Sequence, residues 1–203
     1  MGRQALRGIS QQDKEMNIAT LIDQVELEVE RMALERKARI ALSGKDNLCA
    51  VKCEQYALDV FGLHKPLMEL TSIAWHRGWL NDYGIALDAV GNLSRHFGYP
   101  VQTHNGRIGD LAASLDAGKQ VLAIVDGGEL VGDAFVEGMK DFLYGEQANH
   151  CVVVLICNPE DDRVVLYDPA FGDIPLTVTV PQFLNAWADS GNRYIEISKK
   201  PIN

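Results

Sequence analysis

The sequence predicts an α+β protein whose helices and strands are segregated along the chain. In the N-terminal half, apolar residues recur every three or four positions, which is typical of helices that bury one face. After Gly118, short apolar runs bounded by turn residues replace this period, which is typical of strands. We therefore expect a helical N-terminal half and an antiparallel β-sheet in the C-terminal half, packed as separate layers.

The composition fits one globular domain. The chain has 203 residues, 47% of them hydrophobic, which is enough for a sizeable core. The formal net charge of −9 makes nucleic acid and anionic membrane surfaces poor candidate partners. No stretch approaches the roughly 18 apolar residues of a membrane span. No apolar block follows the basic residues at the N-terminus, which does not fit a secretory signal, so we expect a cytoplasmic protein.

A long amphipathic helix is predicted over residues 15–42, within an N-terminal extension (1–45) that precedes the main domain (46–203). Its apolar stripe recurs at alternating spacings of four and three and consists of Ile18, Ile22, Val25, Val29 and Met32. One interpretation is a coiled-coil seam that forms a homodimer. Packing on its own domain is favoured, because Arg36 and Arg39 take the next seam positions and end the repeat.

The remaining elements are shorter. We expect helices at 49–61, 68–77, 85–96 and 111–117, a further helix that opens at Pro181, and strands at 121–125, 151–156, 164–167, 176–180 and 194–197. The loop 158–162 is rich in turn residues and predicts a hairpin. In that hairpin Cys157 would face Arg163, and Asp168 would lie across from Val152.

Cys49 opens the predicted helix 49–61. The unsatisfied N–H groups and the positive dipole end of a helix stabilise a thiolate, which is the form that attacks a carbonyl. The alternative is that Cys49 is a small buried apolar residue, as most cysteines are. Cys53, one turn later, is a rival nucleophile or a core residue. Its position inside the helix gives it less help from the dipole, so Cys49 is the better candidate.

A histidine and an aspartate flank the predicted hairpin. His150 immediately precedes the first strand, and Asp168 immediately follows the second. A small shift in register would place the two side chains alongside each other. An aspartate beside a histidine can fix the imidazole tautomer and stabilise its charged form, as in a catalytic triad. A strand-end histidine and an ordinary Asp-Pro turn are the alternative.

Four segments together resemble a known family: CAVKCEQYALDVFG (49–62), GKQVLAIVDGGEL (118–130), NHCVVVLICNPEDDRVVLYDPAFG (149–172) and IPLTVTVPQFLNAWADSGN (174–192). They resemble segments of the bacteriocin-processing (double-glycine leader) peptidases and their relatives, in the papain-like cysteine peptidase superfamily. In that family a cysteine opens the nucleophile helix and a glycine closes it 13 residues later, which is the separation of Cys49 and Gly62 here. The resemblance implies a bacterial protein with a papain-like fold and the triad Cys49, His150 and Asp168.

The sequence departs from the family pattern at two places. The family usually has a glutamine six residues before the nucleophile, whose amide helps to form the oxyanion hole, and here this position is Ser43. Loss of one such donor typically costs about 10²–10³ in rate. Asn47, or the backbone N–H of Cys49, is the expected substitute. Many members also have Gly-Pro where this chain has Ala50-Val51, and alanine suits a helix.

The favoured hypothesis is a cysteine hydrolase that cleaves a peptide or a side-chain amide without a cofactor, so its expected partner is a peptide or protein substrate. A glutamine deamidase would use the same groups. The missing glutamine motivates a second hypothesis, a catalytically weak or inactive relative that serves as a binding or scaffold module. A metal site is the least favoured, because the cysteine spacings C-x3-C and C-x5-C do not match a zinc knuckle.

Overall fold

The computed structural model describes residues 47–131 and 148–201. The predicted helix 15–42, its proposed role in a homodimer and Ser43 lie outside the described residues. Within these two ranges, no helix is both long enough and apolar enough to cross a membrane.

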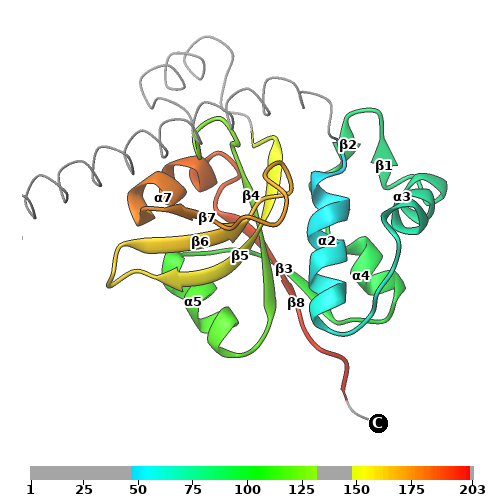
Figure 1. Cartoon of the computed structure of the whole chain (residues 1–203), viewed down its shortest axis with the longest axis horizontal. Coiled ribbons are helices and arrows are strands. Elements are labelled where there is room, and N and C mark those ends of the chain that lie inside the picture. Colours follow the sequence, from blue (N-terminus) through cyan, green and yellow to red (C-terminus); the bar gives the residue numbers. More distant parts are fainter. Residues whose placement is uncertain (1–46, 132–147, 202–203) are drawn as a thin grey trace, which may run out of the picture. The chain divides into compact units, whose positions relative to one another are not determined.

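A six-stranded antiparallel sheet forms the centre of the described chain (Figure 1). Its strands lie in the order β3-β8-β4-β5-β6-β7, so the last strand of the chain is inserted between the first two of this sheet. The strands are β3 (Val101–Asn105), β4 (Gln120–Val125), β5 (His150–Asn158), β6 (Arg163–Tyr167), β7 (Leu176–Val178) and β8 (Arg193–Ile197).

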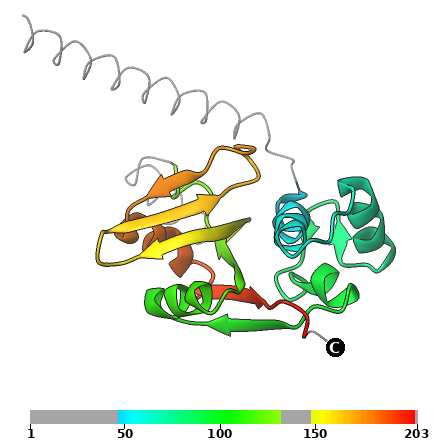
Figure 2. The same ribbon diagram turned by 60° about the horizontal axis from the view of Figure 1, so that its bottom comes forward.

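Helices cover both faces of the sheet (Figures 1 and 2). The helices on one side are α2 (Cys49–Val60), α3 (Leu67–His76) and α4 (Asn92–His96), and those on the other are α5 (Ile108–Asp116) and α7 (Val180–Ala188). Alternate residues of β4 explain this layering, because successive strand side chains point to opposite faces. Leu122 packs in the core beneath α2, whereas Val121 packs in a second core with Trp187 of α7. The predicted α+β class is confirmed.

The β5–β6 hairpin forms as predicted but with a one-residue irregularity. Arg163 pairs with Asn158 rather than with Cys157, so the predicted register is wrong next to the loop. A bulge between Val154 and Ile156 absorbs the difference, and Val153 then pairs with Tyr167. Beyond the bulge the predicted register is confirmed, which directs Asp168 toward the start of β5.

The prediction of a helix over 85–96 is wrong for most of its length. Residues 84–85 form β2 (Gly84–Ile85), which pairs with β1 (Leu80–Asn81), and α4 begins only at Asn92. Gly91 has a φ of 95°, in the left-handed region that glycine adopts easily. It is the N-cap of α4, so the preceding turn ends there and the helix begins at the next residue. Strand β3 was not predicted, because most of its residues are polar and exposed at the edge of the sheet.

A buried carboxylate joins α2 to α4. Glu54 is completely buried, and it accepts hydrogen bonds from Gly91 N–H at 2.9 Å, from Ser94 N–H at 2.7 Å and from the Ser94 hydroxyl at 2.8 Å. Burial raises the pKa of Glu54 to about 6, although these bonds and the charge of Arg95 act in the opposite direction. Glu54 therefore satisfies the first turn of α4 and fixes it against α2.

Glu54→Ala should lower the free energy of unfolding at pH 7 by about 3 kcal/mol, because it leaves three buried donors without their acceptor. Urea denaturation followed by circular dichroism measures the change. Glu69→Ala is the matched control, since Glu69 forms an exposed pair with Lys65 and should cost less than about 1 kcal/mol. Equal effects of the two substitutions would contradict this structural role of Glu54.

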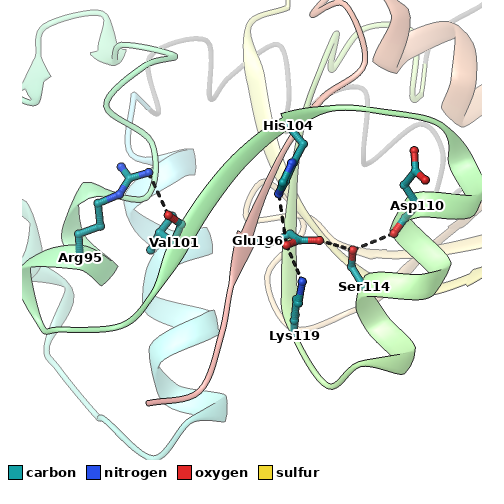
Figure 3. A network of polar contacts seen from close by, with 7 residues as sticks. All are labelled: Arg95, Val101, His104, Asp110, Ser114, Lys119 and Glu196. Atoms are coloured by element: carbon teal, nitrogen blue, oxygen red, sulfur yellow. Dashed lines mark hydrogen bonds and ion pairs between the residues drawn. The ribbon is translucent and has the colours of Figure 1, made fainter. Parts of the chain in front are cut away.

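A second buried carboxylate joins β8 to its neighbours (Figure 3). Glu196 lies 2.6 Å from Lys119 Nζ and 3.3 Å from His104 Nε2, and the Ser114 hydroxyl donates to its other oxygen. Burial alone would raise the pKa of Glu196, but Lys119 and Ser114 bring it below its usual value. A carboxylate satisfied in this way connects strands β3 and β8 with α5. On the adjoining segment, Arg95 Nη2 lies 3.5 Å from the carbonyl oxygen of Val101.

Candidate active site

Helix α2 presents Cys49 as its first residue. Leu48 occupies the N-cap position and supplies no side-chain cap, so backbone N–H groups of the first turn remain directed toward this end of the helix. Cys49 is partly exposed, whereas Ala50 and Val51 behind it are buried. The helix is anchored by its buried face, and Cys49 lies at the margin of that face. This confirms the predicted position of Cys49 at a helix N-terminus.

The β5–β6 hairpin brings together His150 and Asp168. Strand β5 begins at His150, and Asp168 directly follows the end of β6. His150 Nε2 lies 2.7 Å from Asp168 Oδ1. The His150 side chain is 16% exposed and that of Asp168 only 2%, so little water reaches this contact. The same Oδ1 atom accepts a second hydrogen bond from Ala170 N–H at 2.9 Å, which fixes the carboxylate in the turn.

Cys49 and His150 interact closely enough for each to shift the pKa of the other. Because Nε2 of His150 is engaged by Asp168, Nδ1 is the nitrogen that remains for the sulfur. Burial by itself would raise the pKa of Cys49, but the hydrogen bond and charge of His150, together with the N–H groups of Cys151 and Ala50, bring the pKa below 9.0. The site therefore favours a thiolate at position 49.

The imidazole is correspondingly favoured in its charged form. Burial lowers the pKa of His150, yet its hydrogen bonds to Asp168 and Cys49, and the charges of both, raise the pKa to about 10. Both shifts favour a thiolate–imidazolium pair over a neutral thiol and imidazole. Such a pair holds both the nucleophile and the proton that a leaving group needs.

Cys53 differs from Cys49 in its burial, its hydrogen bonding and the direction in which its pKa is shifted. It is completely buried, and its thiol donates a hydrogen bond to the carbonyl oxygen of Cys151 at 3.2 Å. Burial and the neighbouring Cys151 raise its pKa well above 9.0. A buried neutral thiol that donates a hydrogen bond is a core residue rather than a nucleophile. The choice between the two cysteines thus favours Cys49.

The Cys151 backbone is available to the sulfurs of Cys49 and Cys53 because β6 ends before it reaches this residue. Pairing of β5 with β6 begins only at Val153, so residues 150–152 extend past the last paired residue of β6. The Cys151 carbonyl oxygen accepts from Cys53, and the Cys151 N–H contributes to lowering the pKa of Cys49. One peptide segment of β5 thereby sets the position of α2 along the strand.

Asn47 lies beside the site, but its amide is used elsewhere. Its Nδ2 atom donates to the carbonyl oxygens of Asn81 and Asp82, at 3.2 Å each, in the turn between β1 and β2. These two bonds account for both amide hydrogens. The described residues thus leave the backbone N–H of Cys49, in the first turn of α2, as the expected oxyanion donor.

No metal-ligand cluster is found in residues 47–131 and 148–201, where no three His, Cys, Asp or Glu side chains are grouped to hold an ion. All four cysteines are free thiols.

No family model and no curated protein matches the chain in sequence. Solved structures do match the fold. A C39-like peptidase from Bacillus anthracis superimposes with a TM-score of 0.57 at 19% identity, over 77% of this chain and 91% of that one. The chain has the fold of the C39-like peptidases.

A second solved structure agrees. The peptidase domain of Streptococcus ComA, a bifunctional ABC transporter of a quorum-sensing pathway, superimposes with a TM-score of 0.51 at 12% identity. It covers 75% of this chain and 91% of that domain. The predicted papain-like fold is thereby confirmed. Identities this low establish the fold alone.

Two contributors to the site were not predicted, and both are backbone groups. The N–H of Ala170 holds Asp168 in position, and the N–H of Cys151 donates to the Cys49 sulfur. The first had a signal in the sequence, because an aspartate in an Asp-Pro turn commonly accepts a hydrogen bond from the N–H two residues on. The second depends on the packing of α2 against β5, for which sequence spacing holds no signal.

Proposed function

We propose that this protein is a cysteine hydrolase of peptide or side-chain amide bonds, in which Cys49 is the nucleophile, His150 the acid and base, and Asp168 the residue that orients His150. The observation that carries the proposal is the His150–Asp168 contact of 2.7 Å beside Cys49, where His150 lowers the pKa of the thiol. The fold of the two peptidase structures supports it.

The reaction begins with attack of the Cys49 thiolate on the carbonyl carbon, which forms a C–S bond and places negative charge on the carbonyl oxygen. The N–H of Cys49 stabilises this oxyanion. The His150 imidazolium then gives its proton to the leaving nitrogen as the C–N bond breaks, which leaves a thioester on Cys49. Neutral His150 next accepts a proton from water, and the hydroxide attacks the thioester to release the acid and regenerate the thiolate.

The proposal is tested by incubating the protein with a library of unmodified peptides and identifying new termini and Gln-to-Glu changes by mass spectrometry. Products that form with the wild-type protein and vanish with Cys49→Ala are expected, together with a thioester adduct on Cys49 at early times. New termini indicate a peptidase, and a mass increase of about 1 Da at glutamine indicates a deamidase. Identical product lists for the two proteins would refute hydrolysis by this site.

A binding or scaffold module is the second candidate function. The observation in its favour is that both amide hydrogens of Asn47 are donated to the β1–β2 turn, so this side chain supplies no oxyanion donor. Rapid alkylation of Cys49 without any Cys49-dependent product would favour the module. In that case the reactive pair would be intact and the stabilisation of the oxyanion would be missing.

A further inference from the structure

The first turn after β4 lies directly against the proposed acid and base. Val125, the last residue of β4, pairs with His150, so the chain that follows continues alongside the imidazole. A Cβ atom added at Gly127 would lie 3.2 Å from the Cβ, 3.4 Å from the Cγ and 3.5 Å from the Cδ2 of His150. At that separation either the ring or the turn has to move by a few tenths of an ångström. The glycine therefore leaves no spare room beside the ring.

The turn itself is held in place. Gly127 N–H donates to Asn149 Oδ1 at 3.3 Å, and Gly128 N–H donates to Asp126 Oδ1 at 2.6 Å. The N–H of Asp126 donates in turn to the carbonyl oxygen of Ala186 in α7, at 2.8 Å. A larger residue at position 127 cannot simply move outward without breaking these bonds. The tightest contact is with the His150 Cβ at 3.2 Å, so His150, and its ring with it, is the group that would have to move.

Movement of the ring has a direct chemical consequence. His150 is held by Asp168 at one nitrogen and by Cys49 through the other, so a displacement lengthens at least one of these hydrogen bonds. Backbone conformation is not the reason for the glycine, since Gly127 is not among the glycines with positive φ. The contact with His150 is the requirement that excludes a side chain at this position.

We infer that Gly127 is a positioning residue, whose missing side chain allows His150 to contact Cys49 and Asp168 at the same time. This inference rests on the proposed roles of Cys49 and His150. It adds the turn that follows β4 to the parts of the chain that form the site. In a close-packed site, misplacement by a fraction of an ångström is costly to reactivity.

The test compares Gly127→Ala with Gly109→Ala, since Gly109 also lacks a positive φ and an added Cβ there meets nothing within 4 Å. The rate of iodoacetamide labelling of each cysteine is measured by mass spectrometry, with Cys157 as an internal reference. Gly127→Ala should slow labelling of Cys49 about tenfold at pH 6.5. Gly109→Ala should leave it unchanged, and neither substitution should affect Cys157.

The pH profile and a second background separate positioning from a general structural effect. Gly127→Ala should move the rise of Cys49 labelling to higher pH, because a displaced imidazolium stabilises the thiolate less. In a His150→Gln background, the same substitution should have no further effect on labelling. An equal slowing in that background, or equal rates for Gly127→Ala and Gly109→Ala in the wild-type background, would overturn the inference.

Asn149→Ala serves as a second variant that adds no atoms and should fold whether or not Gly127→Ala does. It removes the acceptor for Gly127 N–H and should slow Cys49 labelling about twofold to threefold. An unchanged rate would count against the inference. Failure of the proposed function looks different, since no Cys49-dependent product would then form with the wild-type protein, whatever the labelling rates of the glycine variants.

Discussion

Replacing His150 by glutamine is expected to slow the alkylation of Cys49 about 100-fold at pH 6.5. Without the imidazolium, Cys49 loses the main cause that lowers its pKa, while burial, which raises it, remains. An ordinary thiol of pKa about 8.5 is ionised to about 1% at this pH. Since only the thiolate reacts, the rate falls with the ionised fraction. Hydrolysis should fall further, by about 10³-fold or more, because the leaving nitrogen also loses its proton donor.

Glutamine is preferred to alanine because Asp168 is 2% exposed and would otherwise lose its partner. A glutamine amide can still donate to Oδ1 and preserve the fold, which thermal unfolding checks. Cys157 provides the control within the same molecule, since burial raises its pKa and no histidine adjoins it in the described contacts. If Cys49 and Cys157 were labelled at unchanged rates in the variant, the thiolate–imidazolium pair would not exist.

The elements that carry the site were predictable because each has a local signal. Cys49 lies where an apolar period begins, and the hairpin of His150 and Asp168 is marked by two apolar runs around a turn-rich loop. Local sequence determines such features through propensity and alternation. The predicted register was accurate beyond the bulge, where Val153 pairs with Tyr167 next to Asp168.

The features that escaped prediction depend on contacts distant in sequence. Strand β3 is largely polar, and it is a strand because β8 supplies its hydrogen-bond partners from 88 to 96 positions later in the chain. The segment 85–96 has apolar residues at helical spacing, yet Gly91 interrupts it, and Glu54 of α2 satisfies the new helix start. Gly127 reads in sequence as an ordinary turn glycine. Only the packed structure shows His150 beside it.

Asp168→Asn is expected to reduce the rate of hydrolysis about 10- to 100-fold and to leave the geometry of the site nearly intact. A single atom, Asp168 Oδ1, accepts both from His150 Nε2 and from Ala170 N–H. The carbonyl oxygen of an asparagine in the same rotamer can accept both bonds, so the tautomer of His150 is preserved. What is lost is the negative charge, and with it a major cause of the raised pKa of His150.

The pH profile distinguishes loss of charge from loss of geometry. In the wild-type protein the imidazolium persists until the pH approaches about 10. With asparagine at position 168, the pKa of His150 should fall toward 6.5. The pH range in which thiolate and imidazolium coexist should then narrow from its alkaline side. Labelling rates of Cys49 between pH 5 and pH 10 measure both limits, and a range of unchanged width would refute a role for the Asp168 charge.

The free energy of unfolding should also depend on the Asp168 charge, and the raised pKa of His150 sets the direction of its pH dependence. The pKa of His150 is raised on folding from 6.5 to about 10, so its contribution is fully present below pH 6.5 and is lost as the pH rises through about 10. The difference in the free energy of unfolding between wild type and Asp168→Asn should therefore be largest near pH 6 and smallest near pH 10. Asp168→Ala, which also removes the acceptor for Ala170 N–H, should retain part of its cost at pH 10. The electrostatic role of Asp168 vanishes when His150 becomes neutral, whereas its hydrogen bond from Ala170 N–H does not. A loss of unfolding free energy that persists at high pH in Asp168→Ala but not in Asp168→Asn would therefore separate the two roles.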